Sequence, residues 1–357
     1  MSGLRIRTLI VDDSTLVRQL LTSILSSDPQ IEVVGTAADP LIAREKIKAL
    51  NPDVITLDIE MPRMDGLEFL EKIMALRPMP VVMISSLTQK GVDATMRALE
   101  IGAVDFVAKP TIDVMAGLDE LAAEIIAKVK TAAQARVRAC RRDPSPSGAS
   151  AVGMRYASTD KIIAIGASTG GVESITTVLM DMPADAPGIV VTQHMPQQFT
   201  GSFARRLDST CRIRVAEASD GTRVLPGHAY IAPGGAHLKL VRSGGNFVCR
   251  VGGTDRVSGH CPSVDVLFSS VAETAAANAV GLILTGMGKD GAAGLLAMRK
   301  AGAHTIGQNE ATSVVYGMPR IAFEIGAVEE QVDLDHAAGR ILSSFDTDKK
   351  HRMTAGR

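Results

Sequence analysis

The chain has 357 residues, of which 46% are hydrophobic and 22% charged, and its formal net charge at pH 7 is −1. This length is too great for one ordinary small domain and predicts two, and the composition excludes a disordered protein. The near-zero charge gives no reason to expect nucleic acid or an anionic membrane surface as a partner.

No targeting or membrane-spanning segment is expected. The arginines near the N-terminus precede only a short apolar run that ends in two aspartates, unlike a signal peptide, and no apolar stretch approaches the ~20 residues that cross a bilayer. The cysteines, Cys140, Cys211, Cys249 and Cys261, form no C-x-x-C pair, so reduced thiols are predicted in place of a zinc site or disulfides. A cytoplasmic protein without membrane insertion is therefore expected.

The first third of the chain alternates short apolar runs with amphipathic segments. This alternation predicts a parallel sheet that is covered by helices on both faces. The expected strands are Arg5–Val11, Ile31–Ala37, Asp53–Leu57, Val81–Ser85 and Asp105–Ala108. After the first strand, apolar residues from Val17 to Leu25 recur at helical spacing, and Ser14 is a suitable N-cap for that helix.

Polar side chains lie where these strands end. Asp12 and Asp13 follow the first strand, Asp58 the third, Ser85 the fourth and Lys109 the fifth. Because the carboxyl ends of parallel strands share one edge of a sheet, these groups are expected to converge there. Three carboxylates suit Mg²⁺, an aspartate can attack phosphorus, and a lysine can pair with the carboxylate or the phosphoryl group. Turn, cap or solvent-exposed roles would explain any one position, but not the joint placement.

Four motifs in this region resemble the receiver domain of two-component response regulators, over residues 4–128. They are VDDS at 11–14, TLDIEMPRMDG at 56–66, ISS at 84–86 and DFVAKP at 105–110. The resemblance implies that Asp58 accepts a phosphoryl group from a sensor histidine kinase. It also implies that Mg²⁺ is held by Asp12, Asp13 and Asp58, together with the backbone carbonyl of Glu60.

The same resemblance assigns supporting roles to four further residues. Ser85 would hydrogen-bond the phosphoryl oxygen and Lys109 would contact it. Phe106 stands where the family has an aromatic that changes rotamer on activation, although a core aromatic explains Phe106 equally well. A cis peptide before Pro110 would fix the approach of the lysine.

A composition change marks the end of this region. An amphipathic helix is expected over Leu118–Val129, and the later segment DPSPSGAS at 143–150 cannot bury a core and predicts a flexible linker. The predicted division is a receiver domain over 1–129, a linker over 130–158, a second domain over 159–346 and a tail over 347–357.

The second domain opens with KIIAIGASTGG at 161–171, which places Ser168 between a buried strand and a helix over Val172–Met182. The residues GASTG at 166–170 fit the G-x-S-x-G elbow, in which small neighbours let a hydroxyl project from the end of a sheet. The following helix N-terminus would favour an oxyanion. On this stretch alone, capping of that helix by Ser168 is an equal alternative.

Two more polar residues follow buried strands in this domain. His194 follows the apolar run Gly188–Thr192, and Asp290 follows the run Val280–Leu284. Together with Ser168 they would lie at one edge of a parallel sheet, as a hydroxyl nucleophile, an imidazole base and an orienting carboxylate require.

Each of these residues has an alternative. Asp290 can cap the predicted helix Ala292–Lys300, and His194 can be a structural histidine. His260, in a loop before the periodic segment Val264–Ala272, is the second candidate for the base.

The sequence does not favour nucleotide-binding chemistry in this domain. No G-x-G-x-x-G follows Ile165, and GMGKDG at 286–291 lacks the hydroxyl and upstream glycine of a P-loop.

The residue order of the triad differs from that of α/β-hydrolases, so another sheet topology is expected. Residues 228–253 predict an appended β-hairpin. The predicted fold is α/β, with two doubly wound parallel-sheet domains, the first flavodoxin-like and the second a Rossmann-like hydrolase domain.

Six motifs of the second domain resemble the catalytic domain of chemotaxis methylesterases of the CheB type, over about 159–345. They are IGASTGG at 165–171, QHMP at 193–196, YIAPGGAHL at 230–238, PSVDVLF at 262–268, LTGMGKDG at 284–291 and EATSVVYGMP at 310–319. The resemblance implies that Ser168 is the nucleophile, His194 the general base and Asp290 its orienting partner. The backbone N–H of Met287 would contribute to an oxyanion hole.

A receiver joined to this domain is the architecture of that family. The implied reaction is hydrolysis of glutamyl γ-methyl esters on the cytoplasmic helices of chemoreceptors, with release of methanol and without a metal, and some members deamidate receptor glutamines. The receiver would inhibit until Asp58 is phosphorylated. Cys261 stands where the family usually has an arginine, so the resemblance does not carry over the substrate contacts made at that position, although it still implies the hydrolysis. The alternatives are an esterase for another ester and a response regulator whose second domain binds a ligand or partner without catalysis.

Overall fold

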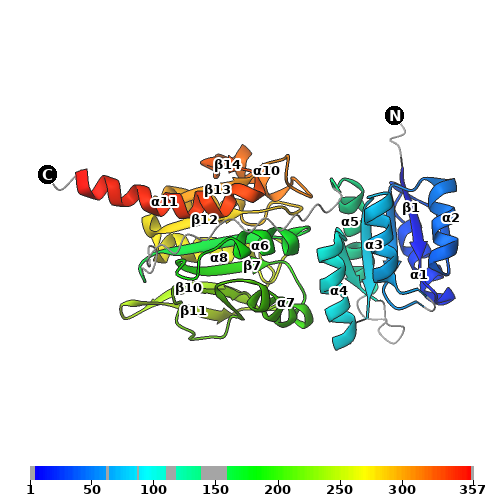
Figure 1. Cartoon of the computed structure of the whole chain (residues 1–357), viewed down its shortest axis with the longest axis horizontal. Coiled ribbons are helices and arrows are strands. Elements are labelled where there is room, and N and C mark those ends of the chain that lie inside the picture. Colours follow the sequence, from blue (N-terminus) through cyan, green and yellow to red (C-terminus); the bar gives the residue numbers. More distant parts are fainter. Residues whose placement is uncertain (1–4, 62–63, 87, 110–117, 138–158, 355–357) are drawn as a thin grey trace. The chain divides into compact units, whose positions relative to one another are not determined.

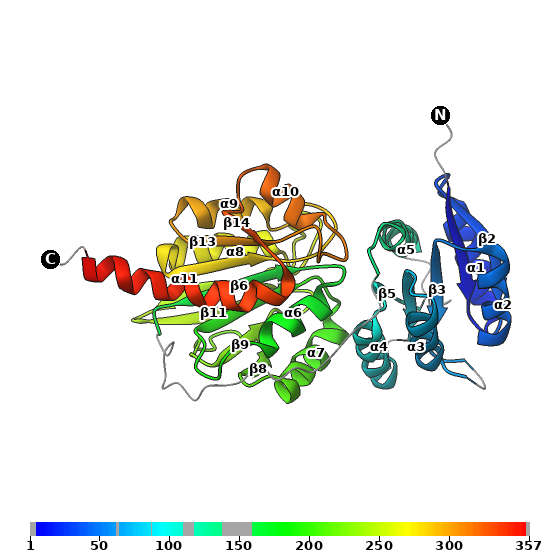
Figure 2. The same cartoon turned by 45° about the horizontal axis from the view of Figure 1, so that its top comes forward.

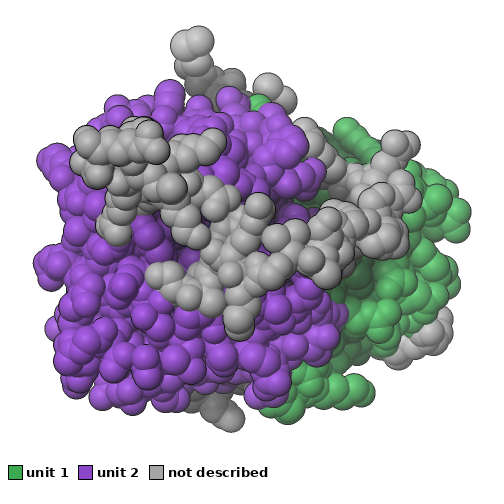
Figure 3. Space-filling model, turned by 60° about the vertical axis from the view of Figure 1, so that its left-hand side comes forward, with its two compact units in different colours: residues 1–144 green, residues 145–357 purple. Residues whose placement is uncertain are grey.

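The chain divides into two compact units, residues 1–144 and 145–357, in a computed structural model (Figures 1 and 3). The structure describes residues 5–61, 64–86, 88–109, 118–137 and 159–354. Pro110, Cys140 and most of the predicted linker therefore lie outside the described residues. No helix among the described residues is long and apolar enough to cross a membrane.

The first unit is a five-stranded parallel sheet with the strand order β2-β1-β3-β4-β5. Its strands are β1 (Ile6–Val11), β2 (Ile31–Ala37), β3 (Val54–Asp58), β4 (Val81–Ser85) and β5 (Asp105–Ala108). Its helices are α1 (Thr15–Ser26), α2 (Pro40–Leu50), α3 (Gly66–Leu76), α4 (Gln89–Ile101) and α5 (Leu118–Ala133). Helices α1 and α5 pack together, as do α3 and α4. This is the flavodoxin-type order, whose switch point lies between β1 and β3.

Local sequence explains these elements. All five residues of β3 and all five of β4 are buried, as expected of central parallel strands. Helix α1 begins where predicted, because the Ser14 hydroxyl accepts a hydrogen bond from the Val17 N–H at 3.4 Å.

The second unit is built on a seven-stranded parallel sheet with the order β14-β13-β12-β6-β7-β9-β8. Its strands are β6 (Ile162–Ala167), β7 (Gly188–Gln193), β8 (Arg214–Glu217), β9 (His228–Ile231), β12 (Ala279–Ile283), β13 (His304–Gln308) and β14 (Glu330–Val332). Its helices are α6 (Gly171–Met180), α7 (Gln197–Thr210), α8 (Val264–Thr274), η1 (Ala276–Asn278), α9 (Ala292–Lys300), α10 (Met318–Glu324) and α11 (Leu334–Thr354). Helices α6, α7 and α11 cover one face of this sheet, and α8, α9 and α10 cover the other (Figure 2).

The predicted α/β class, with a doubly wound parallel sheet in each unit, is confirmed. The predicted hairpin differs in one respect. Strands β10 (His237–Ser243) and β11 (Asn246–Gly252) form the antiparallel hairpin, but His228–Ile231 is a separate strand, β9, of the main sheet. Its last three residues are buried, and it pairs in parallel with β7, so the segment Pro233–Gly235 separates two sheets.

Candidate active site and phosphorylation site

The three predicted residues of the triad follow three neighbouring strands. Strand β6 lies between β7 and β12, and its last residues, Gly166 and Ala167, pair with Ile283 of β12 and Gln193 of β7. The chain runs from β6 to β7 on one side and returns later to β12 on the other, so this edge is the topological switch point of the sheet. Ligands of doubly wound sheets bind at such points.

Backbone hydrogen bonds join these strand ends. The Ser168 N–H donates to the Thr285 carbonyl at 3.0 Å, and the His194 N–H donates to the Ala167 carbonyl at 3.2 Å. The amide of Gln193 donates to the Ser168 carbonyl at 2.9 Å and to the His194 carbonyl at 3.2 Å. Gln193 therefore ties the serine turn to the histidine turn, a role that the sequence analysis did not assign.

His194 and Asp290 form a hydrogen-bonded pair in the interior of the unit. The distance from His194 Nε2 to Asp290 Oδ2 is 2.7 Å, and the two side chains are 8% and 1% exposed. Burial alone would raise the pKa of the Asp290 carboxyl, but hydrogen bonds from His194, the Asp265 N–H and the Ser263 hydroxyl hold that pKa at about 2. The carboxylate is therefore ionised at neutral pH, and it accepts a hydrogen bond from Nε2 of His194, which must carry the hydrogen.

The other ring nitrogen of His194 is the chemically available one. Because Nε2 carries the hydrogen, Nδ1 has a free lone pair, and this atom is buried without a hydrogen-bond partner among the described residues. In the trypsin-type triad, Nδ1 faces the aspartate, whereas in this structure Nε2 of His194 faces Asp290. An unsatisfied buried lone pair is unusual in a purely structural histidine.

Ser168 is half-buried, and its hydroxyl makes no hydrogen bond within the described part of the chain. The capping alternative does not describe its position, since α6 has Gly170 at its N-cap, with φ of 76°, and no side-chain capping bond. The hydrogen bond between Ser168 and His194 is not formed in this structure. Such bonds are often long in a site without substrate and tighten when the substrate binds.

Asp290 does not cap the helix that follows it. The N-cap of α9 is Gly291, which has no side-chain capping bond. The Asp290 carboxylate instead lies at the N-terminus of α8, where it accepts from the Val264 N–H at 2.7 Å, the Asp265 N–H at 3.0 Å and the Ser263 hydroxyl at 2.8 Å. These donors and the positive end of the helix dipole favour the charged form.

His260, the second candidate for the base, lies against the first. Its ring stacks on that of His194, with the ring centroids 3.7 Å apart and the planes inclined by 10°. Burial lowers the pKa of His260 to about 4, and the neighbouring His194 and Arg256 act in the same direction. His260 is therefore neutral at pH 7 and covers one face of the His194 ring.

Close packing also fixes the serine. A Cβ atom on Gly286 would lie 2.3 Å from the Met318 sulfur and 2.7 Å from the Ser168 Cβ, so glycine is required there. Met287, whose backbone N–H is the predicted oxyanion donor, comes directly after this glycine, and the residue is 48% exposed. The oxyanion role of Met287 stays a prediction.

Cys261, which stands in the place of the family's arginine, is half-buried. Its sulfur lies 3.7 Å from the Gly253 carbonyl.

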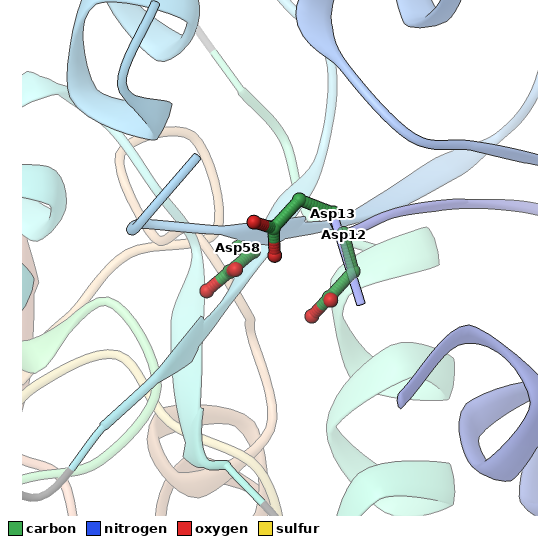
Figure 4. A group of neighbouring side chains, drawn as sticks. All are labelled: Asp12, Asp13 and Asp58. Carbon is green, nitrogen blue, oxygen red and sulfur yellow. The ribbon is translucent and has the colours of Figure 1, made fainter. Parts of the chain in front are cut away.

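In the first unit, the acidic residues gather at the switch point between β1 and β3 (Figure 4). One carboxylate oxygen from each of Asp12, Asp13 and Asp58 lies within 4.8 Å of the others. The Lys109 ammonium lies 2.8 Å from Asp58 Oδ2 and 3.4 Å from Asp12 Oδ2. Burial raises the pKa of Asp58 to about 6, against the opposing effect of Lys109.

This donor set fits a small divalent cation. Asp12 is fully buried, and its Oδ2 has no hydrogen bond among the described residues. Burial also raises the pKa of Asp12 against the opposing charge of Lys109, so a second cation beside it would favour the ionised carboxylate. Carboxylate oxygens at this spacing are the ligands that Mg²⁺ prefers, and Asp13, which is exposed, leaves room for water ligands.

The remaining predicted receiver residues lie around this cluster. The Glu60 N–H donates to Asp58 Oδ1 at 3.4 Å. The Ser85 hydroxyl is buried and engaged with α4, since it donates to the Gly91 carbonyl at 3.1 Å. Phe106 is 4% exposed, with the Lys128 ammonium 4.9 Å from its ring centroid. Their roles toward a phosphoryl group and a metal stay predictions.

Comparisons with known proteins find matches for both units. The family model for the CheB methylesterase matches residues 163–341, and that for the response regulator receiver domain matches residues 8–118. A protein-glutamate methylesterase/protein-glutamine glutaminase of Bordetella bronchiseptica is 57% identical over 353 residues, which make up 98% of this chain and 99% of the relative. A protein-glutamate methylesterase/protein-glutamine glutaminase 1 of Xanthomonas campestris pv. campestris is 58% identical over 346 residues, which make up 95% of this chain and 97% of the relative.

One solved structure covers the second unit. The crystal structure of the Thermotoga maritima CheB methylesterase catalytic domain shares 38% of its sequence with this chain, covers 51% of this chain and 97% of its own, and superposes with a TM-score of 0.50. The resemblances carried by the sequence motifs are thus confirmed. This chain belongs to the CheB methylesterase family, in the form that joins a response regulator receiver domain to the methylesterase domain.

Proposed function

We propose that this chain is a cytoplasmic protein-glutamate methylesterase that hydrolyses glutamyl γ-methyl esters on the helices of chemoreceptors. The observation that carries the proposal is the state of His194. Its Nε2 is bonded to an ionised, buried carboxylate, while its Nδ1 is buried and without a hydrogen-bond partner, beside a serine turn. A module that only binds a partner has no use for this arrangement.

The reaction follows from the atoms available. The Ser168 hydroxyl attacks the ester carbonyl and gives its proton to His194 Nδ1, while Asp290 stabilises the resulting imidazolium. The backbone N–H of Met287 donates to the oxyanion, a contact of a kind that contributes about 2.7–4 kcal/mol. The imidazolium then protonates the departing methoxide, which leaves as methanol. Water, activated by His194, hydrolyses the acyl-enzyme and frees the glutamate.

The same acyl-enzyme can form from a glutamine side chain, with ammonia as the leaving group. The relatives named above carry the glutaminase activity in their names. We therefore include deamidation of receptor glutamines in the proposal. No step of either reaction uses a metal, because the nucleophile, the base and the oxyanion donor all come from the chain.

The first unit supplies regulation. Asp58 accepts the phosphoryl group of a sensor histidine kinase, and Asp12, Asp13, Asp58 and the Glu60 carbonyl are the residues that would hold Mg²⁺. When bound there, the cation would supply charge neutralisation for the transferring group. Lys109, which pairs with Asp58, and Ser85 would then contact the phosphoryl oxygens. In this proposal the receiver inhibits the esterase until Asp58 is phosphorylated.

Methanol release from methylated receptors tests the proposal directly. The variant Ser168→Ala should lose this activity and its labelling by a serine-reactive probe, while Asp58 is still phosphorylated by the kinase. Asp58→Asn should keep the labelling and lose the activation by the kinase. Turnover by Ser168→Ala would place the nucleophile elsewhere, and probe labelling without methanol release would indicate another ester substrate.

A further inference from the structure

A chain of buried hydrogen bonds leads away from the His194–Asp290 pair. The Ser263 hydroxyl donates to Asp290 Oδ1 at 2.8 Å, and the Ser263 backbone N–H donates to Nδ1 of His237 at 3.1 Å. Nε2 of His237 then lies 2.7 Å from the backbone carbonyl of Asp255. Ser263, Asp290 and His237 are 0%, 1% and 5% exposed, so water does not compete for the two bonds of Ser263.

The partners of His237 define its tautomer. A backbone N–H can only donate, so Nδ1 of His237 must be the acceptor, and a carbonyl can only accept, so Nε2 must carry the hydrogen. The neutral Nε2–H form therefore satisfies both neighbours at once. Each hydrogen bond of His237 can therefore run in only one direction: its Nε2–H donates to the Asp255 carbonyl, and its Nδ1 accepts from the Ser263 N–H.

Ser263 has two simultaneous roles at the start of α8. Its hydroxyl oxygen accepts from the Val266 N–H at 3.4 Å as the N-cap, which leaves the hydroxyl hydrogen for Asp290. It donates to the carboxylate through its side chain, as His194 does, whereas Val264 and Asp265 donate through backbone N–H groups. Ser263 thus fixes Asp290 relative to α8, and His237 fixes Ser263 relative to strand β10 of the hairpin.

We infer that Ser263 and His237 are positioning residues for the hydrolytic reaction, which hold the Asp290 carboxylate in the plane and direction that His194 needs. This inference rests on the proposed function. Neither residue reaches the substrate. They act through Asp290, and the hairpin thereby supports the reaction from behind the sheet edge.

The variant Ser263→Ala tests the first link. It removes one donor to Asp290, and we expect kcat for methanol release to fall by about 10- to 100-fold with KM nearly unchanged, the size of effect that small misplacements produce. Ser270→Ala is the matched control, because Ser270 is a buried serine of the same helix whose hydroxyl accepts from the Leu240 N–H of β10 and does not contact Asp290. The control should lose thermal stability without losing kcat.

His237 allows a sharper comparison between two variants. Asparagine places a carbonyl oxygen where Nδ1 lies and keeps the acceptor for the Ser263 N–H, whereas glutamine places an amide nitrogen where Nε2 lies and keeps only the donor for Asp255. We expect kcat of His237→Asn to exceed that of His237→Gln by about tenfold at similar melting temperatures. A purely structural histidine would make both variants fail alike.

A spectroscopic measurement separates positioning from loss of folding. The Nε2–H proton of His194, bonded to Asp290, should give a low-field ¹H resonance in the full-length protein, and this resonance should shift or broaden in Ser263→Ala and remain in Ser270→Ala. An unchanged resonance with unchanged kcat in Ser263→Ala would overturn the inference. Failure of the proposed function would appear differently, as methanol release by the Ser168→Ala variant.

Discussion

The imidazole rings of His194 and His260 lie face to face, with their centroids 3.7 Å apart and their planes 10° from parallel. One ring is hydrogen-bonded to a buried carboxylate and retains a free lone pair, whereas the other is kept neutral by burial, which lowers its pKa to about 4. A neutral ring at this distance excludes water from one face of His194 and restricts rotation of its ring. His260 therefore covers one face of His194, the proposed base.

We predict that replacing His260 lowers the rate of catalysis. In His260→Ala, water reaches the open face of His194 and the ring can rotate, so kcat for methanol release at pH 7 should fall by about tenfold. His260→Phe keeps an aromatic ring against His194 and should keep kcat near the wild-type value. The measurement is methanol release at pH 7, where His260 is neutral, and equal rates for the two variants would contradict the prediction.

His260 also predicts a pH dependence of stability. Its pKa falls from 6.5 in the unfolded chain to about 4 in the folded one because burial disfavours the charged ring, so the folded state loses stability as the pH falls through this window. After a discount for partial exposure, this loss is about 2 kcal/mol. Denaturant unfolding of the full chain at pH 7 and pH 4.5 should show a smaller loss for His260→Phe than for the wild type, and equal losses would exclude the assignment.

The sequence located the candidate triad because each member follows an apolar strand run. Helix capping was the alternative role for two of its members, Ser168 and Asp290. Ser168 caps nothing, since glycine begins α6. Asp290 does bind a helix N-terminus, but it is that of α8 and not that of the following helix, α9. Local spacing indicates that an aspartate suits a cap, yet it cannot tell which of two helices will be brought to it.

The roles of His237 and Ser263 could not be predicted from the sequence for the same reason. His237 meets Ser263 across 26 positions, and Ser263 meets Asp290 across 27, so the contacts depend on how the hairpin and α8 pack and not on any local pattern. A signal was present in Ser263, which precedes the periodic segment as an N-cap does. In the receiver, the strand-end aspartates and Lys109 were predicted together, whereas the contact of Ser85 with α4 was not.

Gly286 offers a test of how tightly the serine must be held. A methyl group there would lie 2.7 Å from the Ser168 Cβ and must displace either that side chain or Met318. We expect Gly286→Ala to lower kcat by about 100-fold, since displacements near 1 Å have effects of that size. Gly339→Ala, on α11, is the control, because a Cβ there meets nothing within 4 Å, and its activity should match the wild type. A fully active Gly286→Ala variant would mean that the serine turn tolerates this shift.

The ion pair between Lys109 and Asp58 predicts how Mg²⁺ stabilises the receiver. With Lys109→Met, Asp58 and Asp12 lose the ammonium that lies 2.8 and 3.4 Å away, so the unliganded fold should be destabilised and Mg²⁺ should raise its melting temperature more than in the wild type. Lys130→Met is the matched control, since Lys130 pairs at 3.1 Å with Asp28, outside the cluster, and the two lysine side chains are 24% and 30% exposed. Calorimetry of the full chain with and without Mg²⁺ gives both shifts. An equal Mg²⁺ effect in the two variants would show that Lys109 and the cation do not act on the same carboxylates.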